Sequence, residues 1–279
     1  MDVLFRNQFS AAQIFAAEPG LQSQVRVGFD AMDSSASGAE SGAGIATSFA
    51  VLDAFLPWRG WPVGAMSEIM TDRVGCGEMS LVLPAMARLS QEKRQILCVG
   101  APHELFASAL IDAGIDPARV TQINAAEASH SNKKQKENLW CTEQILKTGL
   151  PGMVLLWSRN TCTPEVLRRL QLAMMNTQTV LIHFRSNACM QQHSPAWLRC
   201  GFAADDVEIQ LQILKCRGRL LTRPLITLDR AAVQRRLYAQ FSADKALRNA
   251  VAHGMPINAR TSVDDGMLIA KQPGTHTLQ

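Results

Sequence analysis

The stretch MVLLWSRNTCTPEVLRRLQLAMMNTQTVLIHF, residues 153–184, contains the alternation that decides the fold. Residues 153–157 (MVLLW) and 179–184 (TVLIHF) are near-continuous apolar runs, which is typical of strands buried on both faces of a sheet. Between them, residues 164–175 have the pattern of a helix, with Thr163 as its cap and Pro164 in its first turn. Strand, helix and second buried strand predict a parallel pair with a crossover helix.

The same rhythm extends toward the N-terminus as far as residue 51. Apolar runs predict strands at 67–70, 95–99 (QILCV) and 120–123. Helical spacing predicts helices at 81–89, at 103–113 and at 136–147, and the last two end at glycines. We therefore expect an α/β fold: a mostly parallel twisted sheet with helices on both faces.

After residue 184 the pattern changes to alternation with period two. Residues 207–215 (VEIQLQILK) alternate apolar and polar side chains, Arg217, Gly218 and Arg219 form a turn, and 220–228 is extended again. This pattern predicts an antiparallel hairpin at the edge of the sheet.

Composition limits the possible functions. The 279 residues are 47% hydrophobic and 19% charged, so the chain is globular. Aromatic residues make up only 6%, which disfavours a surface of stacked aromatics for single-stranded nucleic acid. The net charge of +4 is too mild to establish a nucleic-acid partner, but it is uneven: residues 1–50 hold five acids and two bases, and the remainder carries +7.

The seven cysteines include no C-x-x-C pair and most lie in apolar runs. This pattern argues against a zinc site and against a secreted disulfide framework, and it favours reduced core cysteines in a cytoplasmic protein. We find no secretory signal pattern and no apolar run long enough to span a bilayer. We therefore expect a cytoplasmic protein without metal, cofactor or membrane association.

The chain divides into three parts. Residues 1–50 form an N-terminal segment whose last part, 30–49, reads as a flexible linker rich in Gly, Ala and Ser. Ahead of the linker, a short amphipathic helix is indicated that docks either on a partner or on its own domain; its apolar positions are Phe5, Phe9, Ala12, Ile14 and Phe15. Residues 51–228 form the core. Residues 229–279 contain a helix that reaches about residue 253, which binds a partner or packs on the core, and a polar tail.

The strand, glycine turn and helix at 67–89 occupy the place of a phosphate loop. A working loop reads G-x-x-x-x-G-K-[ST], so that backbone amides cradle phosphate, the lysine neutralises it and the hydroxyl holds magnesium. Here DRVGCGEM (72–79) places acids at the first glycine and at the lysine, and the strand 153–157 ends in Trp157 where an ATPase carries aspartate. We expect no nucleotide binding and no enzymatic activity. The degenerate loop consists of Asp72, Gly75, Gly77, Glu78 and Met79.

The segment LDAFLPWRGWPVGAMSEIM (52–70) resembles the stretch that leads into the core of the ImuA family, bacterial accessory proteins of SOS mutagenesis. The family pattern LP-x-x-G-x-P-x-G-x-x-x-E is matched in full, from Leu56 to Glu68. Four further stretches look like their family counterparts in order, so the likeness covers about 51–228. They are AGIDPARV (113–120), LWCTEQILKTG (139–149), LRRLQLA (167–173) and ILKCRGRL (213–220).

The resemblance implies a RecA-like core that lacks the ATPase motifs and acts as a non-catalytic scaffold in SOS-induced translesion DNA synthesis. The implied partners are ImuB, a Y-family polymerase relative, and an error-prone DNA polymerase α subunit; DNA and RecA are further candidates. The segment 186–194 stands where RecA has its longer DNA-binding loop. SulA division inhibitors, which bind FtsZ, share a reduced form of this core and are the rival assignment.

Basic residues concentrate at the hairpin turn and near it in sequence. We select as candidate DNA- or partner-binding residues Arg185, Lys215, Arg217, Arg219 and Arg223. They form either a contact edge for a polyanion or acidic partner, or an ordinary solvated turn. The family likeness favours contact.

Two further features have structural interpretations. Trp58 and Trp61 could anchor a partner, but packing under the edge of the sheet is favoured. His183 lies within an apolar strand with no nucleophile at a meaningful spacing, so we expect a core histidine.

Overall fold

The computed structural model describes residues 44–71, 75–124, 131–158, 162–219, 225–231 and 233. The expected N-terminal amphipathic segment and most of the expected C-terminal helix lie outside these residues, as do Asp72 and Arg223. The described strands are β1 (Gly44–Ile45), β2 (Trp61–Pro62), β3 (Met66–Met70), β4 (Ile96–Val99), β5 (Val120–Ile123), β6 (Met153–Ser158), β7 (Val180–Arg185), β8 (Leu198–Ala204), β9 (Glu208–Cys216) and β10 (Leu225–Asp229).

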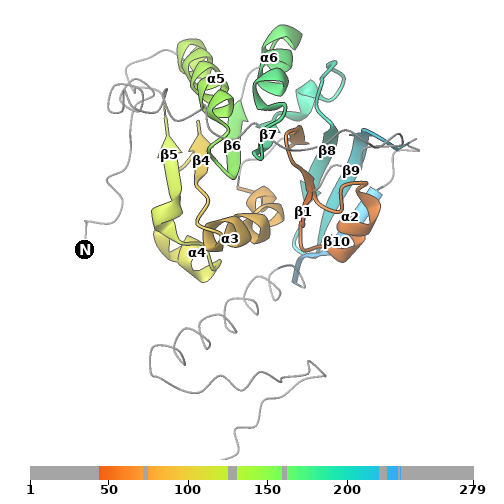
Figure 1. Cartoon of the computed structure of the whole chain (residues 1–279). Coiled ribbons are helices and arrows are strands. Elements are labelled where there is room, and N and C mark those ends of the chain that lie inside the picture. Colours follow the sequence, from red (N-terminus) through yellow and green to blue (C-terminus); the bar gives the residue numbers. More distant parts are fainter. Residues whose placement is uncertain are drawn as a thin grey trace, which may run out of the picture. The chain divides into compact units, whose positions relative to one another are not determined.

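Eight of these strands form one sheet in the order β10-β9-β8-β3-β7-β6-β4-β5 (Figure 1). The pairs from β8 through β3 to β5 are parallel, whereas β9 is antiparallel to both β8 and β10. The short strands β1 and β2 pair separately. The predicted α/β fold with a mostly parallel sheet and an antiparallel edge hairpin is confirmed.

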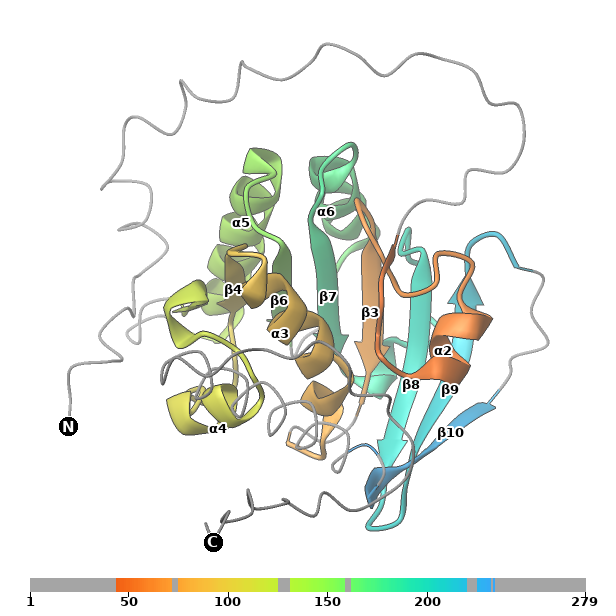
Figure 2. The ribbon, with the colours of Figure 1, turned by 60° about the horizontal axis from the view of Figure 1, so that its bottom comes forward.

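Helices cover both faces of the sheet. The described helices are α2 (Ala50–Phe55), α3 (Leu83–Gln91), α4 (Ala107–Asp112), α5 (Ser131–Thr148) and α6 (Pro164–Met174), with single 3-10 turns η1 (Glu78–Leu81), η2 (Pro117–Arg119) and η3 (Asn187–Cys189). Figure 2 shows α3 and α4 on one face and α5 and α6 on the other.

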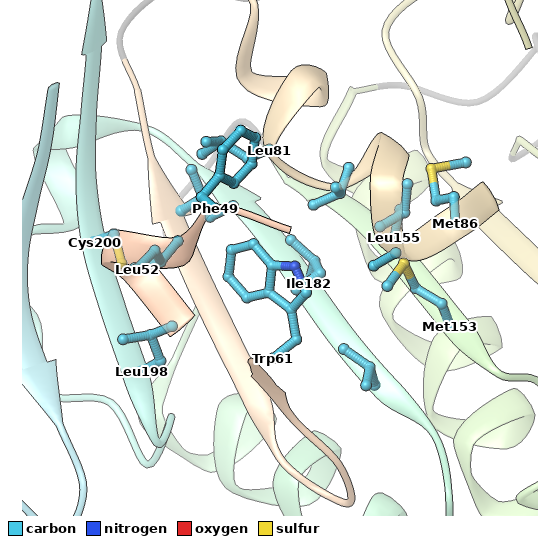
Figure 3. Packing of buried hydrophobic residues seen from close by; sticks show 14 of the residues in the cluster. Phe49, Leu52, Trp61, Leu81, Met86, Met153, Leu155, Ile182, Leu198 and Cys200 are labelled. Carbon is cyan, nitrogen blue, oxygen red and sulfur yellow. The ribbon is translucent and has the colours of Figure 1, made fainter. Parts of the chain in front are cut away.

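Each central strand contributes to both halves of the core because successive side chains point to opposite faces. Leu155 and Ile182 pack with the α3 side, and their neighbours Leu156 and Leu181 pack with the α5 and α6 side. Trp61 is 1% exposed and lies among the α3-side residues (Figure 3). Trp58 is buried as well, so both tryptophans pack under the sheet, as predicted.

Two helices differ from their predicted limits. The predicted helix at 103–113 is wrong in its first four residues, because the backbone there bonds to a side chain: Gln122 accepts from the Leu105 amide at 3.1 Å and donates to the His103 carbonyl at 3.1 Å. Helix α5 begins five residues earlier than predicted, so Lys133 and Lys134 also lie on the helix. Lys133 and Glu137 form an (i, i+4) ion pair, which favours a helix in this polar stretch.

Strand β8 was not predicted. β8 carries Arg199 inside an otherwise apolar stretch, which hides its strand pattern, although Arg199 is only 7% exposed. The described pairing of β10 with β9 runs from Leu225 opposite Gln212 to Asp229 opposite Glu208, and residues 220–224 of the predicted hairpin lie outside the described residues.

The predicted core roles of His183 and of the cysteines are confirmed. His183 is fully buried, and six of the seven cysteines are buried as well. Among the described residues, no helix combines the length and apolar character needed to cross a membrane.

Candidate functional site

In the degenerate phosphate loop, the side chain of Glu78 bonds a backbone amide of the loop itself. Gly75 and Gly77 have φ values of 79° and 105°, in the left-handed region that glycine favours. The Gly75 amide donates a hydrogen bond of 3.0 Å to the Glu78 carboxylate, and Glu78 is 3% exposed. Met79, where a working loop carries a hydroxyl, packs against the core. An amide that could cradle phosphate therefore already bonds an internal anion.

The neighbouring strand ends carry an aromatic pair. Ligands of open α/β sheets bind at the carboxyl ends of the strands, where the strand order reverses. Here β7 follows β6 along the sheet, and Trp157 near the end of β6 stacks on Phe184 of β7 with ring centroids 4.8 Å apart. No aspartate follows β6, whose last residue is Ser158.

We expect calorimetric titration with ATP and magnesium to give no binding heat up to millimolar nucleotide. The reason is repulsion: a phosphate would meet the buried Glu78 carboxylate in place of a lysine. Binding in the micromolar range would contradict this prediction. A Glu78→Ala variant tests whether Glu78 is what excludes anions, since it removes the internal acceptor.

A buried ion cluster lies on the opposite face of the sheet, where β3, β7 and β8 run side by side. Glu68 of β3 is fully buried and bonds Arg185 of β7 at 2.8 Å and Arg199 of β8 at 2.6 Å. Burial alone would raise the pKa of Glu68, but the charges of Arg185 and Arg199 hold that pKa below its usual range. We call Glu68, Arg185 and Arg199 the ion cluster.

The placement of Arg185 corrects one of the candidate binding residues. Its side chain is enclosed: the residue is 2% exposed and its guanidinium pairs with Glu68. A buried arginine whose charge is neutralised inside the sheet is unable to present that charge to DNA or to a partner. Arg185 therefore does not belong to the basic surface predicted from the sequence.

The ion cluster fastens the segment 186–197 onto the sheet. Arg185 donates to the Gln192 side chain at 2.7 Å, and the Ser194 hydroxyl donates to Glu68 at 2.9 Å. Arg199 donates to the Cys189 carbonyl at 3.0 Å. Residues 186–197 are therefore bonded to the sheet through Cys189, Gln192 and Ser194.

Lys215 contributes to the same attachment. Its ammonium group donates to the Ser194 carbonyl at 2.8 Å, and Lys215 lies opposite Arg199 in the register of β8 and β9. Burial and the nearby Arg199 charge lower its pKa. Lys215 is half-buried and positions the segment, so it is less available to a partner than its place in the sequence suggested.

Arg217 and Arg219 are the predicted residues that the structure places at the surface. The Arg217 guanidinium carbon lies 4.4 Å from the centre of the Trp197 ring, and the corresponding carbon of Arg219 lies 4.7 Å from the centre of Phe55. Trp197 in turn packs against Trp58 with ring centroids 5.6 Å apart. Both arginines are exposed, and within the described residues neither forms an ion pair with a carboxylate. We call Arg217 and Arg219, with their aromatic supports, the arginine edge.

The arginine edge and the ion cluster are connected through the segment 186–197. Trp197 ends that segment, its amide donates to the Met66 carbonyl, and the Arg217 amide donates to the Trp197 carbonyl at 2.8 Å. Sequence reasoning missed Trp197 and Phe55 as supports for the arginines. The sequence does carry a signal for the ion cluster, because its three charged residues stand inside otherwise apolar strand sequences.

No family model matches the chain, and the search of curated proteins found no match. The ImuA likeness of residues 52–70 therefore rests on the motifs themselves. The described part of the chain contains no cluster of three or more His, Cys, Asp or Glu side chains suited to a metal ion.

Proposed function

We propose that this protein is a non-catalytic accessory of SOS-induced translesion DNA synthesis, with a RecA-like core that acts as a scaffold for ImuB and an error-prone polymerase α subunit. The observation that carries the proposal is Glu78, which fills a phosphate loop in the place where a RecA-like ATPase binds nucleotide. The five ordered ImuA-like motifs and the α/β sheet support the same assignment. A scaffold of this kind would keep the sheet and lack the chemistry, and the acidic residue in the loop supports that assignment.

The arginine edge is the contact surface in this proposal. Stacking on Trp197 and Phe55 restricts the two guanidinium groups before any partner arrives, so less side-chain entropy is lost on binding. Apart from a bond of 3.5 Å from Arg219 to the Ala54 carbonyl, their N–H groups are available for bonds to carboxylate or phosphate oxygens. An acidic surface of ImuB or a DNA backbone has the matching chemistry.

Replacing both arginines, Arg217→Glu with Arg219→Glu, should weaken binding of ImuB or of DNA by about 30- to 1,000-fold, because each of the two lost contacts costs on the order of 1–2 kcal/mol. The melting temperature should stay within about 2 °C, because both side chains are exposed. Affinity measured by pull-down and by fluorescence anisotropy over a salt series checks the prediction.

The matched control reverses the same number of charges elsewhere, Lys93→Glu with Lys136→Glu, at two exposed positions. The control should leave specific binding nearly unchanged. If both double variants weaken binding equally, only net charge matters, and the arginine edge is a solvated turn.

A sedimentation assay with FtsZ separates this proposal from the SulA-like alternative. We expect FtsZ polymers to sediment normally in the presence of an equimolar amount of the protein. Inhibition at a near-equal molar ratio would overturn the accessory role and support a division inhibitor.

A further inference from the structure

A group of exposed apolar side chains lies where α5 and α6 end. Leu150, Leu172 and Met175 are 61%, 54% and 52% exposed. The chain segments that carry them run side by side: the Thr179 hydroxyl donates to the Pro151 carbonyl at 2.7 Å, and a Cβ on Gly149 would lie 3.4 Å from the Thr177 side chain. We call Leu150, Leu172 and Met175 the apolar patch.

The described chain begins close to this patch. Gly64 lies against the end of α6: its amide donates to the Thr179 carbonyl at 2.9 Å, and a Cβ there would lie 3.1 Å from the Thr177 carbonyl oxygen. Pro62, two residues earlier, pairs with Gly44. A strand pair and two further residues together span about 12 Å at most, so Gly44 lies within that distance of Gly64.

The 43 residues ahead of Gly44 contain the amphipathic stretch with Phe5, Phe9 and Phe15. Residues 16–43 number 28, and a random coil of that length has an end-to-end distance of about 30 Å, which is enough for the stretch to reach the patch. Within residues 4–15 the only charged residue is Arg6, and the acids Asp2 and Glu18 flank the stretch on either side. The rim of the patch carries basic side chains: Arg94 donates to the Gln178 carbonyl at 2.8 Å, and Arg168 is exposed one turn before Leu172.

We propose that residues 4–15 dock on the apolar patch of their own chain. A stable interface between two separate molecules buries about 800 Å² on each partner, far more than three side chains provide. A tethered segment needs to bury much less surface area to stay bound, because the tether raises its effective concentration to about the millimolar range. The small size of the patch and its nearness to Gly44 therefore favour an intramolecular occupant over a second copy.

Hydrogen exchange on the full-length chain tests the docking. Amides of residues 4–15 should exchange at least about 10-fold more slowly in the unmodified protein than in a Leu172→Glu, Met175→Glu variant. The factor is the ratio of the effective concentration of the tethered segment, about 1 mM, to a dissociation constant of about 0.1 mM for the contact. Phe9→Glu should remove the same protection and should also raise exchange at 149–152 and 173–177. Both patch residues are exposed, so the variant should keep its fold.

Phe106→Glu is the control, because Phe106 is another exposed apolar residue, at 77%, and precedes α4. It should leave the protection of residues 4–15 unchanged. Two results would overturn the proposal. One is exchange of residues 4–15 at the rate of an unstructured peptide in the unmodified protein. The other is protection that disappears on dilution, which would assign the patch to a second copy.

Discussion

Glutamine in place of Glu68 is expected to lower the free energy of unfolding by about 3–5 kcal/mol. The substitution keeps the shape of the side chain and its ability to accept hydrogen bonds, but it removes the one negative charge that Arg185 and Arg199 share. Glu68 is fully buried and both arginines are nearly so, which means that water is unable to replace the lost charge. Urea denaturation of the unmodified protein and of the variant measures the loss, provided that the free energy of unfolding depends on urea concentration with the same slope in both.

Glu92→Gln is the matched control. Glu92 also pairs with an arginine, Arg88, at 3.1 Å, but both side chains are largely exposed. Its loss should change stability by less than about 0.5 kcal/mol. A loss under about 1 kcal/mol for Glu68→Gln would show that the ion cluster is not the enclosed group described here.

A triple variant separates the cost of an unpaired charge from the net contribution of the cluster. Glu68→Leu, Arg185→Met and Arg199→Met replaces all three charges by apolar groups of similar volume. Replacement of a complete buried ion group is often neutral or stabilising, whereas removal of one member is not. We therefore expect the triple variant to recover most of the stability that Glu68→Gln loses.

The same cluster should influence the proposed contact surface. Glu68 and its partners hold the segment 186–197, and Trp197 at the end of that segment supports Arg217. A Glu68→Gln protein studied below its unfolding midpoint should therefore bind the partner more weakly although Arg217 is intact. The triple variant, which recovers stability but lacks the bonds to the segment, should not recover full binding.

Stability should fall steeply between pH 6.5 and pH 3 because of His183. Burial, and secondly the charge of Arg185, lower the pKa of His183 to about 3, from 6.5 in the unfolded chain. The folded state thus binds fewer protons than the unfolded state in this range, so the stabilisation is complete above pH 6.5 and is lost as the pH falls. One such group costs about 2 kcal/mol between pH 7 and pH 5. Denaturation at a series of pH values measures the slope.

His183→Gln should reduce that slope by nearly one proton, because glutamine does not titrate and can still bond the Ser158 hydroxyl, which lies 2.7 Å from the His183 ring. His103→Gln is the control, since His103 is exposed. An unchanged slope in His183→Gln would contradict the assignment. Below about pH 4.5 the sign is the same for Glu68: its folded pKa is lowered, so its stabilisation is present above the unfolded value and is lost as the acid becomes protonated.

Much of the fold could be predicted because the signals are local. The runs at 153–157 and 179–184 are β6 and β7, and the alternation at 207–215 is β9. These patterns indicate which side of a strand or helix is buried. The side chains on one side recur every two to four residues, so a short stretch of sequence is enough to show the pattern. The missed strand β8 and the shortened α4 are cases where a contact distant in sequence overrode the local pattern: Arg199 with Glu68, and Gln122 with the chain near Leu105.

The candidate site was predicted less well. Among its basic residues, Arg185 and Lys215 face inward and Arg217 and Arg219 face outward, although all four lie in or next to the last strands of the sheet. The difference depends on which strands are neighbours. Glu68 meets Arg199 across 131 residues of sequence because β8 returns to lie beside β3, and no pattern along the chain records that pairing.

The amino-acid sequence by itself determined the α/β class, the positions of most strands, and the acidic phosphate loop that argues against nucleotide binding, because each depends on side chains close together along the chain. Only the tertiary structure decided which arginines are neutralised inside and which remain free to bind. Burial of a charge is tolerated only next to an opposite charge. The order of the strands supplies Glu68 to Arg185 and Arg199, and it leaves Arg217 and Arg219 stacked on aromatic rings at the surface.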